Sequence, residues 1–112
     1  MAPQLKRLQA FFCQTPMGRE PVREWLKELT PEDRKVVGTD IKDVEFSWPL
    51  GKPLVDSLGR GLWEVRSSIK DGIARVIFHV EGSRMVLLHG FVKKTQKTPD
   101  REINLALKRM KG

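Results

Sequence analysis

Apolar residues recur along this chain with two periods, one typical of helices and one typical of strands. The change from one period to the other indicates where the predicted helices end and the predicted strands begin. Near the N-terminus the spacing is helical: Pro21 suits a first helical position, and the stripe behind it follows i, i+3, i+4, i+7. A second helix is predicted to begin at Pro31, with Thr30 as its N-cap. We expect the two helices to form an antiparallel hairpin. Their buried stripes are Val22, Trp25, Leu26 and Leu29, then Val37, Ile41, Val44 and Trp48.

The second half of the chain alternates with the period of a strand. Leu62–Ile69, residues 73–80 and residues 85–92 are the predicted strands. A shorter apolar stretch, residues 5–12, predicts an opening strand, although the same pattern could begin a helix. Residues 49–61 hold three glycines and two prolines and predict an irregular connection.

A last helix is predicted after Thr98, which is interpreted as an N-cap with Pro99 behind it. The buried stripe of this helix is Ile103, Ala106, Leu107 and Met110. The order β-α-α-β-β-β-α predicts an α+β fold with a mainly antiparallel sheet, an N-terminal helical hairpin and a C-terminal helix. The length, 112 residues, is that of a single domain, residues 1–112.

Tight turns at Lys70-Asp71-Gly72 and Glu81-Gly82 set the pairing of the three strands. A two-residue loop at the first turn places Arg66 opposite Arg75 and Glu64 opposite Ile77. Two facing guanidiniums repel each other. The pair is tolerable when Glu64 neutralises part of the positive charge, and it is useful when a phosphate of the ligand supplies the remaining negative charge. One face of the strands carries Trp63, Val65, Ala74, Val76, Phe78 and Val80, and the other carries Glu64, Arg66, Arg75, Ile77 and His79.

Charge is concentrated in the same half of the chain. Residues 1–60 carry ten basic and nine acidic side chains, whereas residues 61–112 carry eleven and five. The net charge of +7 favours a polyanionic partner such as nucleic acid. The stretch GFVKKTQKTP, residues 90–99, puts three lysines within five residues where the third strand ends. Lys93 and Lys94 are therefore expected to join Arg66 and Arg75 in one concave patch.

Other features narrow the class of protein. The single cysteine, Cys13, lies in an apolar run and is expected to be a reduced packing residue in a cytoplasmic protein. No apolar stretch is long enough to span a bilayer or to act as a secretion signal, so no membrane association is expected. No His, Cys or carboxylate cluster has metal-ligand spacing, and neither a metal nor another cofactor is expected.

The ordered series LWEVRS, RVIF and LHGFVKKTQKTP, followed by EINLA, resembles the phage-derived Gp49-like and HigB-like branch of the RelE/ParE toxin superfamily. The resemblance is close over the C-terminal half and covers the N-terminal half in element order. It implies a RelE-like fold and the toxin of a type II toxin–antitoxin pair, a translation inhibitor that acts as a ribosome-dependent mRNA endonuclease, or mRNA interferase. It also implies two partners, the ribosome with its mRNA and a cognate antitoxin, often a helix-turn-helix protein.

Roles carried over from the resemblance fall on the basic residues. Arg66 and Arg75 match its strand arginines, and Lys93 with Lys94 match its basic pair after the last strand, which makes these four the candidate catalytic residues. Metal-free cleavage through the RNA 2'-hydroxyl needs a proton acceptor, cations at the scissile phosphate and a proton donor. Lys97, Phe91 and His79 are the candidate nucleic-acid contacts.

Several alternatives stay open. The chain contains no tyrosine, so the tyrosine that some superfamily members use for stacking or proton transfer has no counterpart, and Phe91 or Trp63 could only stack. The arginines could instead form surface ion pairs with Glu64, and the lysines a solvated turn. The register of a tight turn places His89 on the core side, as a packing residue. A gyrase-poisoning toxin without nuclease activity and a non-catalytic RNA-binding module are the competing functions.

Overall fold

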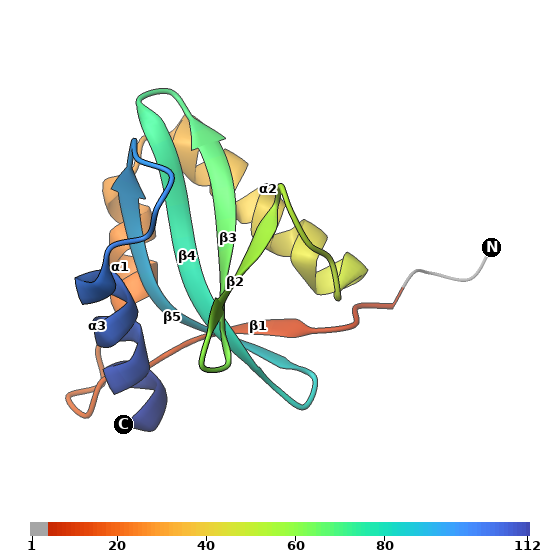
Figure 1. Cartoon of the computed structure of the whole chain (residues 1–112), viewed down its shortest axis with the longest axis vertical. Helices are drawn as coiled ribbons and strands as arrows, with labels where there is room; N and C mark the ends of the chain where they lie inside the picture. Colours follow the sequence, from red (N-terminus) through yellow and green to blue (C-terminus); the bar gives the residue numbers. More distant parts are fainter. Residues whose placement is uncertain (1–4) are drawn as a thin grey trace.

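The computed structural model describes residues 5–112 as three helices and a five-stranded mixed sheet, and the first four residues of the predicted 1–112 domain lie outside this range. The sheet has the order β1-β5-β4-β3-β2. Its antiparallel part is β2 (Val55–Gly59), β3 (Leu62–Ile69), β4 (Gly72–Glu81) and β5 (Arg84–Lys93), and β1 (Gln9–Phe12) pairs with β5 in parallel. Helices α1 (Pro21–Glu28) and α2 (Pro31–Ser47) lie behind the sheet in Figure 1, and α3 (Asp100–Lys111) lies in front. The predicted α+β fold is therefore confirmed.

Both N-terminal helices begin where the sequence predicts. Pro21 opens α1, and the Thr30 side chain accepts a hydrogen bond from the Asp33 amide at 3.2 Å, which caps α2. The helices contact the sheet more than each other, because α1 packs on β5 while α2 packs mainly on β3. The expected helical hairpin is thus two helices that cover one sheet face side by side.

The main core lies between these helices and the sheet. Val37, Val65 and Phe78 are fully buried there, as the helical spacing predicts for Val37 and the strand alternation predicts for Val65 and Phe78. Trp48 at the end of α2 meets Trp63 edge to face, with ring centres 5.1 Å apart. Because alternate strand residues point to opposite faces, a second, smaller core forms under α3. Its buried members are Leu62, Ile77, Leu88, Phe91 and Ala106.

Two predicted boundaries are wrong. The opening strand starts at Gln9 and not at residue 5, because the Arg7 and Leu8 amides donate to the Glu45 carbonyl at the end of α2. The supposedly irregular segment 49–61 contains the edge strand β2. Gly59 and Gly61 do not interrupt a strand; they lie at the β2–β3 turn, where Arg60 and Gly61 both have positive φ, as the tight turn of a β-hairpin requires.

A β-bulge between β4 and β5 changes which side chains share a face. Phe78 pairs with Leu87, but the next residue, Ile77, pairs with His89, so Leu88 is the extra residue. His89 therefore faces α3, together with Ile77, and the expected core-side position of His89 is wrong. Beyond the bulge, Phe91 pairs with Arg75 and shares its face.

Gly90 on β5 gives a test of how closely α1 approaches the sheet. A Cβ at this position would lie 2.7 Å from Trp25 Cδ2, so Gly90→Ala is expected to lower the free energy of unfolding by about 1–3 kcal/mol. Urea denaturation measures the change. Gly38→Ala is the matched control: no atom lies within 4 Å of the added methyl on α2, and we expect a gain of about 0.5–1 kcal/mol. Equal stability of the two variants would contradict this packing.

None of the helices in the described range 5–112 is long and apolar enough to cross a bilayer.

Candidate nucleic-acid interface

The candidate site is built on the sheet face that α1 and α2 leave uncovered, and it reaches Val36 and Asp40 of α2. Arg66 pairs with Arg75 across β3 and β4, and Glu64 pairs with Ile77, so the predicted register is confirmed. Lys93, the last residue of β5, pairs with Ile73 on β4. The chain then leaves the sheet as a loop of residues 94–99, named here the lysine loop, which leads into α3 (Figure 1).

Glu64 supplies a buried negative charge beneath the two arginines. The residue is 1% exposed, and its Oε2 accepts a hydrogen bond of 2.6 Å from the Thr98 hydroxyl. Its other oxygen, Oε1, lies 3.7 Å from Arg66 Nε. A buried carboxylate needs such compensation, since an unpaired charge in the interior is very costly.

Arg75 is fully buried and is bonded to the lysine loop. Its Nη1 donates to Thr98 Oγ1 at 3.1 Å, and its Nη2 donates to the Thr95 carbonyl. Burial lowers the pKa of Arg75 below its ordinary value; the attraction of Glu64 opposes this shift, and the charge of Arg66 adds to it. The guanidinium thus bonds to oxygens of its own chain, and the structure assigns Arg75 an anchoring contact.

Arg66 differs from Arg75 because its side chain reaches a cleft. Its Nη2 donates to the Gln96 carbonyl at 3.3 Å and to Gln96 Oε1 at 3.1 Å, and 17% of its side chain is exposed. The cleft has a volume of about 640 Å³, within the range of small-ligand sites. Its lining is partly apolar, from Val36, Pro53, Leu54 and Ile73, and partly polar, from Asp40, Lys52, Arg66, Ser68 and Gln96.

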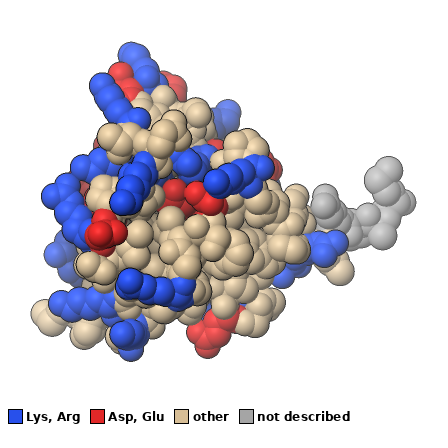
Figure 2. All heavy atoms as spheres, viewed as in Figure 1, with Lys and Arg blue, Asp and Glu red and all other residues tan. Residues whose placement is uncertain are grey.

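The three lysines of residues 93–97 do not share one position. Lys93 pairs with Ile73 and therefore lies on the Arg75 face, next to a residue that lines the cleft. Lys94 is exposed, and its Cγ lies near Gly72 beside Val92, on the side that faces the helices. Lys97 is exposed on the lysine loop. Figure 2 shows Lys and Arg side chains gathered along the edge that carries this loop and α3.

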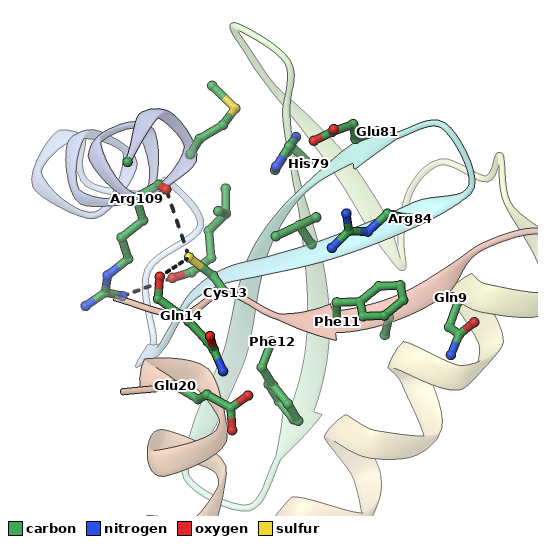
Figure 3. Close-up of a pocket in the computed structure, with 15 residues that line it drawn as sticks. Gln9, Phe11, Phe12, Cys13, Gln14, Glu20, His79, Glu81, Arg84 and Arg109 are labelled. Carbon is green, nitrogen blue, oxygen red and sulfur yellow. Dashed lines mark hydrogen bonds between the residues drawn. The ribbon is translucent and has the colours of Figure 1, made fainter. Parts of the chain in front are cut away.

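Phe91 and His79, two predicted RNA contacts, lie away from this cleft. Phe91 is 7% exposed under α3, and its ring is stacked on His89 with centres 5.4 Å apart. His79 shares the Arg75 face, but it lies nearer the far end of β4. There it lines a separate cavity of about 630 Å³ together with Glu81, Arg84 and Arg109 (Figure 3).

Cys13 is the only cysteine of the chain and is unpaired, as expected. It is half-buried beside α3, with its thiol 3.9 Å from the Arg109 carbonyl (Figure 3). Burial raises the pKa of the Cys13 thiol, and Arg109 opposes the shift. The thiol is therefore held in its neutral, less nucleophilic form.

His89 gives a pH test of how α3 is attached. Burial lowers its pKa, while the hydrogen bond of 2.8 Å to Glu102 Oε1 on α3 opposes the shift, and Arg109 Nη1 lies 3.2 Å from the other ring nitrogen. A histidine with a lowered native pKa binds its proton less readily folded than unfolded, so stability is full above the ordinary value near 6.5 and falls as the pH drops below it. Urea denaturation at pH 7.5 and 5.8 should show this loss.

The loss of stability between pH 7.5 and pH 5.8 should be smaller in the His89→Asn variant. His79 also has a pKa lowered by burial, so His79→Asn is the matched control, and the His79→Asn/His89→Asn variant should show the least pH dependence in this window. An unchanged pH dependence in the double variant would contradict the assignment.

No group of three or more His, Cys, Asp or Glu side chains within residues 5–112 is placed to hold a metal ion. The polar groups that line the cleft are the Asp40 carboxylate, the Lys52 ammonium, the Arg66 guanidinium, the Ser68 hydroxyl and the Gln96 amide.

The structure also brings in residues that the sequence pattern did not mark. The predicted N-cap position of Thr98 is wrong, because Pro99 is the N-cap of α3. Thr98 is a buried residue, 6% exposed, and its hydroxyl lies between Arg75 and Glu64. Lys52 and Gln96 line the cleft with Arg66. The sequence feature that could have indicated this role is the Thr-Pro pair after a strand, because such a threonine can hydrogen-bond to strand side chains as well as cap a helix.

Comparison with known proteins supports the family resemblance that the sequence motifs indicate. None of the curated proteins matches the chain. The family model described as Phage derived protein Gp49-like (DUF891) matches residues 24–111. This match runs from α1 to the last residue of α3 and includes the Arg66–Arg75 pair, the cleft and the lysine loop. The chain therefore belongs to the Gp49-like family.

Proposed function

We propose that this protein is the toxin of a type II toxin–antitoxin pair and cuts mRNA on the translating ribosome. The observation that carries the proposal is the cleft at the end of the sheet, where the partly exposed Arg66 lies beside Lys52 and next to the Lys93 strand end. Membership of the Gp49-like family and the resemblance to RelE/ParE toxins support the same reading. The antitoxin that we propose as its inhibitor is a helix-turn-helix protein.

The proposed reaction is an attack of an RNA 2'-hydroxyl on the neighbouring phosphate. A bond forms between O2' and phosphorus, the bond from phosphorus to O5' breaks, and the 2'-hydroxyl proton passes to a base while O5' receives one from an acid. Arg66 stabilises the charge that gathers on the phosphate oxygens, since a guanidinium donates two parallel hydrogen bonds. Lys93, on the same face as Arg66, is the candidate for proton transfer. Lys94, which points toward the helix side, and Lys97 are the candidates to hold the backbone of mRNA or ribosomal RNA.

Translating ribosomes test the cleavage directly. Purified protein is added to mRNA with and without ribosomes, and primer extension maps the new ends. Discrete cuts in the presence of ribosomes, with 5'-hydroxyl ends that a kinase labels without prior phosphatase treatment, are the expected result. Intact mRNA with stabilised DNA breaks would favour gyrase poisoning. Binding of RNA without any cleavage product would favour a non-catalytic RNA-binding module.

Expression in cells tests the toxin assignment separately. Induction of the protein alone should arrest growth, and co-expression of the neighbouring gene should relieve the arrest. Growth that is unaffected in both cases contradicts a toxin. The protein is expected in the cytoplasm, where the ribosome lies.

A further inference from the structure

We propose that Glu64, Arg75 and Thr98 are positioning residues whose buried hydrogen-bond chain holds the lysine loop against the sheet. The inference rests on the proposed function for the identity of the substrate, but the attachment of the loop does not depend on it. It assigns Arg75 a different task from Arg66. Arg66 contacts RNA, whereas Arg75 acts through the loop.

Burial keeps this chain of three away from a substrate. Arg75 is 0% exposed, Glu64 is 1% exposed and Thr98 is 6% exposed. An RNA phosphate could reach Arg75 only if the lysine loop first left the sheet. The same oxygens that would have to leave, the Thr95 carbonyl and Thr98 Oγ1, are those to which the guanidinium donates.

The direction of the hydrogen bonds is fixed by chemistry. A guanidinium can only donate and a carboxylate can only accept, so the Thr98 hydroxyl accepts from Arg75 and gives its single proton to Glu64. A hydroxyl is the smallest group that can do both. A side chain at position 98 without one would leave Glu64 Oε2 without this donor and Arg75 Nη1 without this acceptor.

Along the loop, the residues bonded to the two arginines directly follow Lys94 and lie on both sides of Lys97. Arg75 bonds to residues 95 and 98, and Arg66 bonds to residue 96, whereas Lys94 and Lys97 are exposed. The loop has no regular helix or strand structure, so side-chain contacts of this kind fix its path. The position of the loop cations relative to Arg66 therefore depends on the buried chain, and small displacements of positioned groups are costly in catalysis.

Thr98→Val tests the proposal, because it removes the hydroxyl and keeps the shape of the side chain. Two readouts are combined: native-state trypsin cleavage after Lys94 and Lys97, mapped by mass spectrometry, and kcat with KM for mRNA cleavage on ribosomes. We expect trypsin cleavage at both lysines to be about 10-fold faster in this variant, and kcat to fall by about 10- to 100-fold with a much smaller change in KM.

Two further variants separate the hydroxyl from other effects. Thr98→Ser restores the hydroxyl and should recover most of kcat and of the protease resistance. Thr39→Val makes the same exchange on the exposed surface of α2 and should change neither readout. If valine at position 98 prevents folding, Thr98→Ala removes the same hydroxyl without adding a methyl group.

The outcomes that overturn the proposal are distinct. Equal protease resistance and equal kcat in Thr98→Val and in the unaltered protein contradict it, as does a Thr98→Ser variant that fails like valine. Faster trypsin cleavage with unchanged kcat shows a loop anchor without a role in positioning, which also contradicts it. If the unaltered protein cuts no mRNA, the proposed function fails, while trypsin cleavage still decides whether the hydroxyl holds the loop.

Discussion

Replacing Arg66 by alanine should lower the rate of mRNA cleavage by about 10²- to 10³-fold, the usual loss when one stabilising donor is removed from a transition state. Arg66 is the arginine whose side chain reaches the cleft, and its neighbour Glu64 already receives a hydrogen bond from Thr98. The measurement is kcat/KM on translating ribosomes, with primer extension as the readout. Thermal unfolding should show that the variant remains folded.

Arg84→Ala is the matched control for Arg66→Ala. Arg84 is an exposed arginine at the opposite end of β5, and its guanidinium lies 4.6 Å from the centre of the Phe11 ring. The control removes the same charge from the molecule and should change kcat/KM by less than about threefold, since surface charges far from a site act mainly by long-range attraction. Equal losses in both variants would show that overall charge alone carries the effect.

Arg75→Met should destabilise the fold rather than act at the substrate, with a loss of about 3 kcal/mol in the free energy of unfolding. The reason is that Glu64 would stay buried after losing the positive charge that is linked to it through the Thr98 hydroxyl, and breaking a buried pair typically costs about 3–5 kcal/mol. Arg66 Nε, 3.7 Å from Glu64 Oε1, keeps the loss near the lower limit. Urea denaturation at pH 7.5 measures it.

Removal of the buried charge should recover part of that loss. In the double variant Glu64→Gln/Arg75→Met the amide still accepts from the Thr98 hydroxyl, but no unpaired carboxylate remains. We expect the double variant to be more stable than Arg75→Met alone. If the double variant is less stable by the sum of the two single losses, the two side chains do not interact and the described chain from Arg75 through Thr98 to Glu64 is wrong.

Arg66→Ala and Arg75→Met are expected to have different effects, although the sequence alone does not distinguish the two arginines. Both lie on strands, both face the same side and both match the basic positions of the family resemblance. The β3–β4 turn predicted their pairing, because a two-residue loop leaves one register. Their different burial could not be predicted, since it depends on where the lysine loop returns to the sheet, and that is set by Thr98 and α3.

Sequence by itself determined the helices, the three long strands and the β3–β4 register, because period, N-caps and tight-turn residues act over a few neighbouring positions. The tertiary structure alone decided the bulge at Leu88, which puts Phe91 and Lys93 on the Arg75 face and turns Lys94 away. It also decided the parallel pairing of β1 with β5 and the buried place of Thr98. These features depend on contacts between segments distant along the chain, and a local pattern of apolar and polar residues does not encode such contacts.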